Sequence, residues 1–306
     1  MNSNDPHPNI TQLIRQDIQE ISPKPIQDFQ LIRAKSGVYV YRCLYDGTPA
    51  VAKYLQKEDD RREILNYRIL AQHGIPTIET YAFGKATLIM EDISYSEEWR
   101  LGIAEDLQDA AVSKILAQWY FTFHENGAAV TGLDTLYFEY DSITEENLKV
   151  LIQKFPSAKA TLQFILTHCD KLRGLIYKPS FTLTYNDFYW TNLVARKDKS
   201  AAMMFDYNLL GKGYRFSDFR NVCWHMSCEA KATFVDEYNR LYFEKHGSTR
   251  TESEKLEQSI DAVASGLFSL IVAFTQHEHN PNWGKCSKDE ALNGSLLSKA
   301  ELLFNA

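Results

Sequence analysis

Five polar residues of this 306-residue chain lie within or beside apolar segments, where a polar group without a partner costs free energy. They are Lys53, Glu63, Asp187, Asn192 and Asp206. Their types suit the transfer of a phosphoryl group from a nucleotide, which needs a lysine to hold phosphate oxygens and an acid to orient that lysine. The same chemistry needs two oxygen ligands for Mg²⁺ and a carboxylate that positions the acceptor hydroxyl and accepts its proton.

The segment LTYNDFYWTNLVA, residues 183–195, places Asp187 and Asn192 five positions apart in a stretch that otherwise resembles a protein core. Asp206 follows a second apolar stretch, MMF. An amide oxygen and a carboxylate oxygen on adjacent strands suit magnesium rather than zinc or copper. A bound metal and phosphate would complete the hydrogen bonding of these embedded groups.

The first 92 residues predict a small five-stranded antiparallel sheet with one crossing helix, preceded by an amphipathic helix at 9–21. Residues 28–55 alternate in polarity and carry two turn signals, Ser36-Gly37 and Asp46-Gly47, which divide them into three strands. Residues 59–74 return to helical spacing, and two short strands follow. The short strands are expected at 78–83 and 87–91.

The chain from residue 93 onward is mainly helical by its periodicity. Helices are expected at 104–125, 144–153, 158–176, 217–228, 230–245, 252–275 and 288–303. The exception is a pair of short strands, 192–195 and 202–205, around a charged turn. We therefore expect two lobes of an α+β protein, residues 1–92 for nucleotide binding and 93–306 for catalysis and substrate binding.

These motifs, in this order, resemble the aminoglycoside phosphotransferase and choline kinase-like family, whose fold is related to that of the protein kinases. The resemblance covers about residues 28 to 245 and is carried by the motifs VAK, EILNYRILAQHGIP, LIMED, Asp187-x4-Asn192 and FDYN, followed by GKGYRFSDFRN. It implies a bilobal kinase-like fold that binds ATP or GTP with Mg²⁺.

The resemblance also implies a role for each matching residue. Lys53 would contact the phosphates, oriented by Glu63, and Asp187 would be the catalytic base. Asn192 and Asp206 would be the metal ligands. The nucleotide base would lie against Glu91 and Ile93, its phosphates would be covered by the Ser36-Gly37 turn, and Asp218 would brace the catalytic loop.

Two departures from the family pattern leave a second reading open. The family has histidine two residues before the base, where this chain has Tyr185, and its phosphate-covering loop holds more glycine than Ser36-Gly37. A nucleotide-binding regulator without turnover would explain both. Taken singly, each motif residue also has an ordinary explanation as a surface charge or a turn cap, so an unrelated helical binding protein is a third reading.

The net charge and the apolar stretches of the chain indicate which kinds of partner it can bind. A formal net charge of −7 gives no basic footprint for a nucleic acid and suits a cationic or sugar-like small acceptor with a hydroxyl. The longest apolar stretch, residues 265–274, is too short to span a bilayer. We expect a cytoplasmic protein, monomeric or dimeric, with no membrane partner.

The acceptor is expected to be an aminoglycoside-type antibiotic, with choline, ethanolamine, homoserine, thio-sugars and fructosamines as alternatives. Candidates for an acidic acceptor wall are Glu139, Asp141, Glu145, Glu146, Glu229, Asp236 and Glu237. The aromatic run at 188–190 beside the base could stack on such an acceptor.

Five scattered cysteines suit free thiols in a reducing compartment. Cys223, His225 and Cys228 are conceivable zinc ligands, although a buried helix is the simpler reading of CWHMSC.

Overall fold

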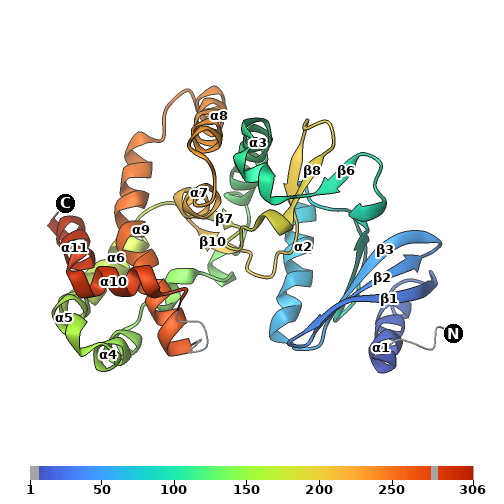
Figure 1. Ribbon diagram of the computed structural model, residues 1–306, viewed down its shortest axis with the longest axis horizontal. Coiled ribbons are helices and arrows are strands. Elements are labelled where there is room, and N and C mark those ends of the chain that lie inside the picture. Colours follow the sequence, from blue (N-terminus) through green and yellow to red (C-terminus); the bar gives the residue numbers. More distant parts are fainter. Residues whose placement is uncertain (1–6, 277–281, 306) are drawn as a thin grey trace. The chain divides into compact units, whose positions relative to one another are not determined.

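The computed structural model describes residues 7–276 and 282–305 (Figure 1). Its contacts divide the chain into two compact units. Unit 1 contains the chain up to Thr131 together with Tyr185–Leu210 and Asn221–Lys245, and unit 2 contains Gly132–Thr184, Gly211–Arg220 and the chain from His246 onward. This division by contacts does not follow the expected lobe boundary at residue 92, which stays a prediction.

Unit 1 opens with the predicted five-stranded sheet. Its strands are β1 (Ile26–Lys35), β2 (Val38–Tyr45), β3 (Thr48–Leu55), β4 (Thr80–Phe83) and β5 (Thr87–Glu91), in the spatial order β1-β2-β3-β5-β4. All neighbouring pairs are antiparallel. Both expected turns hold two residues with positive φ, +54° and +93° at Ser36-Gly37 and +54° and +79° at Asp46-Gly47. Such turns match the twist of the strands they join.

Two helices accompany this sheet. Helix α1 (Pro8–Gln19) buries Ile10, Ile14 and Ile18 in one apolar cluster with residues of β2, β3 and β5. Asp17 on the same helix accepts hydrogen bonds from the backbone N–H groups of Lys85 (2.8 Å) and Ala86 (2.9 Å), so α1 is tied to the β4–β5 turn. Helix α2 (Arg62–Gln72) follows the 3-10 turn Asp59–Arg61 and ends near Gly74, as predicted.

The rest of unit 1 contains a second small sheet with strand order β6-β8-β9. Strands β8 (Leu193–Arg196) and β9 (Ala202–Met204) confirm the predicted hairpin, whereas β6 (Trp99–Leu101) was not predicted. The helices of this part are α3 (Ala110–Gly127) and α8 (Cys228–His246), with 3-10 turns at Ile93–Tyr95, Ala104–Gln108 and Trp190–Asn192. The residues of helix α7 (Arg215–Cys223) are assigned to unit 2 up to Arg220 and to unit 1 from Asn221.

Unit 2 is mainly helical. Its helices are α4 (Glu145–Lys154), α5 (Lys159–Thr167), α6 (Cys169–Ile176), α9 (Thr251–Ile271, continued by a π-helical turn at Val272–Gln276), α10 (Lys285–Asn293) and α11 (Ser295–Asn305). Strands β7 (Thr182–Thr184) and β10 (Gly211–Gly213) form an antiparallel pair, and 3-10 turns lie at Leu133–Thr135, Glu139–Ser142 and Pro156–Ala158.

Two single helices expected in unit 2 are each divided. The segment 158–176 breaks at His168, and 288–303 breaks at Gly294, which has a left-handed φ of +83°. A left-handed glycine ends a helix at low steric cost, so both halves of the second segment can bury their apolar faces in the core of unit 2.

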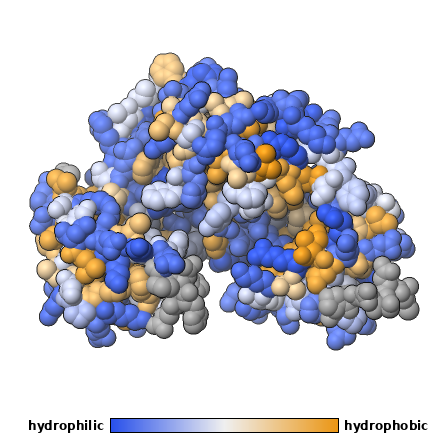
Figure 2. Space-filling view, viewed as in Figure 1, coloured by the Kyte–Doolittle hydropathy of each residue, from blue (hydrophilic) through white to orange (hydrophobic). Residues whose placement is uncertain are grey.

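The segment Thr251–Thr275 is long and apolar enough to cross a membrane, but 56% of its apolar window is buried inside the protein. A core helix meets the same criteria, so this segment carries no membrane assignment. The molecular face in Figure 2 is largely hydrophilic, with apolar side chains in scattered patches.

Replacing Asp17 with alanine removes the acceptor of two backbone N–H groups of the β4–β5 turn. We expect the free energy of unfolding to fall by about 1 kcal/mol, measured by urea denaturation. Gln12→Ala, at an exposed position of the same helix, is the control and should change little. Equal losses in both variants would show that the Asp17 contacts do not stabilise the fold.

Candidate active site

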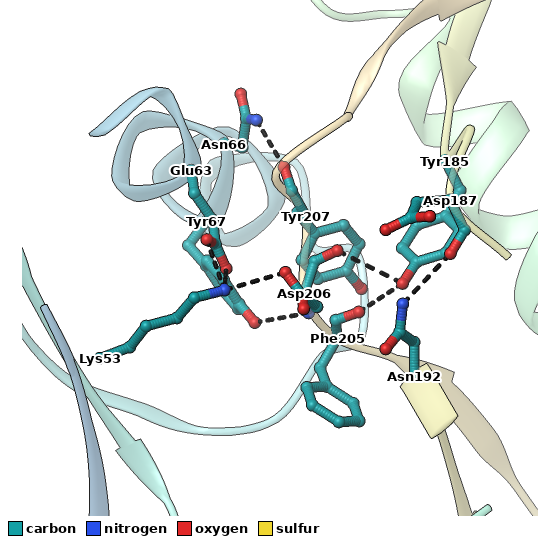
Figure 3. Close-up of polar contacts among 10 residues, drawn as sticks. All are labelled: Lys53, Glu63, Asn66, Tyr67, Tyr185, Asp187, Asn192, Phe205, Asp206 and Tyr207. Atoms are coloured by element: carbon teal, nitrogen blue, oxygen red, sulfur yellow. Dashed lines mark hydrogen bonds and ion pairs between the residues drawn. The ribbon is translucent and has the colours of Figure 1, made fainter. Parts of the chain in front are cut away.

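Lys53 is fixed by the middle of the main sheet, where β3 places it between Val40 of β2 and Leu88 of β5. Its Nζ atom lies 2.6 Å from a Glu63 carboxylate oxygen and 2.9 Å from Oδ1 of Asp206 (Figure 3). The side chains of Lys53 and Glu63 are only 12% and 1% exposed. The three predicted residues therefore meet at one buried ammonium group, although Asp206 is 153 positions from Lys53.

Burial and neighbouring charges both shift the pKa values of the groups at this junction. Burial by itself lowers the pKa of Lys53, but the carboxylates of Glu63 and Asp206 outweigh burial and raise it. Burial raises the pKa of Glu63 to about 7, against the attraction of Lys53. Lys53 therefore stays cationic at neutral pH and can present a positive charge to a phosphate.

The β8–β9 hairpin brings Asn192 opposite Phe205, the residue before Asp206. Because Leu193 pairs with Met204, the residue before β8 lies opposite the residue after β9, and the Phe205 N–H donates to the Asn192 carbonyl at 3.1 Å. The Asn192 side-chain nitrogen donates to the backbone carbonyl of Asp187 at 3.2 Å, which leaves the amide oxygen as the atom able to ligate a cation. An amide oxygen beside a carboxylate fits the ligand preference of Mg²⁺.

Asp187 is half-buried in the loop between β7 and β8. Burial raises its pKa, the charge of Asp206 raises it further, and Lys53 opposes both. A raised pKa makes this carboxylate a stronger base once it is ionised. These electrostatics suit a proton acceptor, and the role of Asp187 as the catalytic base stays a prediction.

Gly102 holds the same loop in place and was missed by sequence reasoning. A Cβ atom at this position would lie 2.3 Å from the Trp190 carbonyl oxygen, and the Gly102 N–H donates to the Leu193 carbonyl at 2.7 Å. Only glycine permits this approach. A lone glycine outside a recognised motif gave no signal, because its role depends on β6, which was itself not predicted.

Tyr185 stands where the resembling family has histidine. Its side chain is buried, and its hydroxyl donates a hydrogen bond to the Phe205 carbonyl, immediately before Asp206. Tyr185 therefore ties the loop that carries Asp187 to the segment that carries the second predicted metal ligand. Asn66, Tyr67 and Tyr207, which were not predicted, also contact this segment (Figure 3).

The four residues expected near the nucleotide base and phosphates lie at strand ends or in the turns that follow strands. Ser36 and Gly37 form the β1–β2 turn, and the Gly37 carbonyl accepts from the Gln56 N–H (3.0 Å), just beyond β3. Glu91 ends β5, and Ile93 begins a 3-10 turn capped by Asp92. Their contacts with a nucleotide stay predictions.

Other candidate residues have structural roles. His124, on α3, is fully buried and bonds to the hydroxyl of Tyr238 (2.9 Å), so it is part of the core. Cys223 is buried and Cys228 exposed, and within residues 7–276 and 282–305 no group of three His, Cys, Asp or Glu side chains could hold a metal. Asp218 is buried in α7, and its bracing role stays a prediction.

Solved structures of several kinases and phosphotransferases are similar to this chain over most of its length. A choline kinase from Cryptosporidium parvum matches with a TM-score of 0.57 at 14% identity, covering 97% of this chain and 96% of its own. The fold is kinase-like. A macrolide 2'-phosphotransferase from Brachybacterium faecium matches with a TM-score of 0.57 at 12% identity, covering 94% of this chain and 98% of its own.

A spectinomycin phosphotransferase solved with ADP and spectinomycin matches with a TM-score of 0.52 at 12% identity, covering 90% of this chain and 93% of its own. No protein-family model matches the sequence, and neither does any curated protein. At such identities the likeness establishes the kinase-like α+β fold that the sequence predicted.

Replacing Lys53 with methionine leaves Glu63 as a buried carboxylate without its lysine. We expect the free energy of unfolding to fall by about 3 kcal/mol at pH 8 in denaturant titrations. Loss of Lys53 raises the pKa of Glu63 above its present value of about 7. Protonation then removes the buried charge, so the deficit should shrink as pH falls through that pKa.

The double variant Lys53→Met, Glu63→Gln is the control for this charge. It should recover most of the stability at pH 8 and lose the pH dependence. A double variant no more stable than Lys53→Met would contradict the buried-charge explanation.

Proposed function

We propose that this protein is a small-molecule kinase that transfers the terminal phosphate of ATP or GTP to a hydroxyl group. This proposal rests mainly on one observation. The carboxylates of Glu63 and Asp206 both lie within 2.9 Å of the Lys53 Nζ atom, next to the loop that holds Asp187 and Asn192. Support also comes from solved kinases and phosphotransferases with the same fold, one of which holds ADP.

Each residue has a defined task in this proposal. Lys53 binds phosphate oxygens and keeps its orientation through Glu63. Asn192 and Asp206 hold Mg²⁺, which when bound neutralises charge on the phosphates. Asp187 accepts a hydrogen bond from the acceptor hydroxyl, aligns its oxygen for attack on the terminal phosphorus, and takes the proton as the new P–O bond forms and the bond to the leaving diphosphate breaks.

We further propose a cationic or sugar-like acceptor, with an aminoglycoside-type antibiotic first among the candidates. Of the aromatic residues beside Asp187, Phe188 is buried, whereas Tyr189 and Trp190 are 58% and 36% exposed and could cover a ring or an ammonium group. The net charge of −7 favours cations.

Some expected acidic wall residues are already engaged by neighbours. Glu237 pairs with Arg240 (2.8 Å), and Glu145 pairs with Lys149 (2.8 Å). Glu139 lies 3.6 Å from the Arg220 guanidinium. Choline, ethanolamine, homoserine, thio-sugars and fructosamines remain alternative acceptors. The free cysteines of the described residues suit our proposal of a cytoplasmic protein.

Phosphate transfer from γ-labelled ATP and GTP with Mg²⁺, tested on amino-sugar antibiotics, choline-like amines and thio-sugars, should identify the acceptor. We expect Asp187→Asn to lower kcat at least about 100-fold, because one general base contributes about 100- to 10,000-fold. Nucleotide-dependent thermal stabilisation should survive in this variant. Nucleotide binding by the wild-type protein without transfer or hydrolysis would favour the regulator instead.

The pH dependence of the same reaction tests the role of Asp187. Its pKa is raised from the ordinary 3.8, and only the ionised carboxylate can accept a proton. Activity should therefore be lost as pH falls through a pKa above 3.8, and a plot of kcat/KM against pH should show this decrease on its acid side. The residual activity of Asp187→Asn should not show the decrease.

A further inference from the structure

The peptide group that joins Phe205 to Asp206 is held at both of its polar atoms by tyrosine hydroxyls (Figure 3). Tyr185 donates to the Phe205 carbonyl oxygen, and the Asp206 N–H donates to the Tyr67 hydroxyl oxygen at 3.1 Å. Both tyrosines are at most 1% exposed. They come from separate parts of unit 1, Tyr67 from α2 and Tyr185 from the start of the catalytic loop.

This peptide group controls the direction of the Asp206 side chain. Asp206 has φ +64°, a left-handed conformation that costs a non-glycine residue about 1 to 2 kcal/mol. Rotation of the peptide group changes ψ of Phe205 and φ of Asp206 together, because these are the torsions on either side of it. Fixing its oxygen and its nitrogen therefore fixes the backbone from which the carboxylate extends.

We propose that Tyr67 and Tyr185 are positioning residues that hold Asp206 in its left-handed conformation and thereby aim its carboxylate at the divalent cation. This inference rests on the proposed function, in which Asp206 is a metal ligand. Neither tyrosine touches the reacting atoms; each acts through the peptide group.

Neighbouring contacts make this arrangement rigid. The ring of Tyr207 lies edge-to-face with the rings of Tyr67 (centroids 5.1 Å apart) and Tyr185 (5.4 Å). Asn66 on α2 donates to the Tyr207 carbonyl at 2.7 Å. The ring packing does not depend on the hydroxyls, so phenylalanine at either position keeps the shape of the cluster. At position 67 it removes the bond to the Asp206 N–H, and at position 185 it removes the bond to the Phe205 carbonyl and a longer one (3.4 Å) to the Asp206 carbonyl.

The test uses Mn²⁺ as the probe cation, with binding in the presence of saturating ADP measured by electron paramagnetic resonance. Tyr67→Phe and Tyr185→Phe should each raise the Kd for Mn²⁺ about five- to tenfold, the equivalent of one hydrogen bond. ADP affinity without the metal should stay unchanged. The matched control is Tyr214→Phe, which removes a buried hydroxyl bonded to the Ile176 carbonyl at 2.5 Å in unit 2.

The outcomes separate the two proposals. If the wild-type protein fails to bind Mn²⁺ with ADP, the proposed function itself is overturned. If it binds and the two variants bind as tightly as Tyr214→Phe, the positioning role is overturned. A loss of Mn²⁺ affinity that Tyr214→Phe shares, in step with a common fall in Tm, also overturns it.

Discussion

A lysine ammonium group enclosed by two carboxylates is the interaction on which the rest of this site depends. Burying a charge is expensive, and a buried charge is tolerable only when opposite charges lie in direct contact with it. Lys53 meets this condition with Glu63 and Asp206. The main sheet, α2 and the β8–β9 hairpin each supply one member, so the ion cluster specifies how these elements of unit 1 pack together.

The second constraint is the conformation of the chain around Asp206. A left-handed aspartate persists when its surroundings hold it there, and here the surroundings are side chains from α2 and from the catalytic loop. Glu63, Asn66 and Tyr67 lie three and four positions apart, on one face of α2. One face of α2 therefore forms hydrogen bonds both with Lys53 and with the segment after β9.

Much of this arrangement could be predicted because its signals are local. Alternating polarity and two glycine turns defined β1 to β3, and Asp187-x4-Asn192 and Asp206, each beside a short apolar strand, indicated polar residues of one site. Gly102 and Tyr67 could not be found this way, because their roles depend on partners 88 to 139 positions away that only the folded chain brings near. The broken helices at His168 and Gly294 were missed because apolar spacing continues across both breaks. Tyr185 was identified as a departure from the family pattern, but its compensating hydrogen bond to Phe205 required coordinates.

Unit 1 is assembled from three separate stretches of the chain, with segments of unit 2 between them. The contact between Lys53 and Asp206 closes a loop of more than a hundred residues. Contacts so distant in sequence slow folding, since chain entropy is lost before they form. A nascent or partly folded chain can thus contain the complete five-stranded sheet and still lack the junction of Lys53 with Asp206, which forms only when the second stretch joins the first.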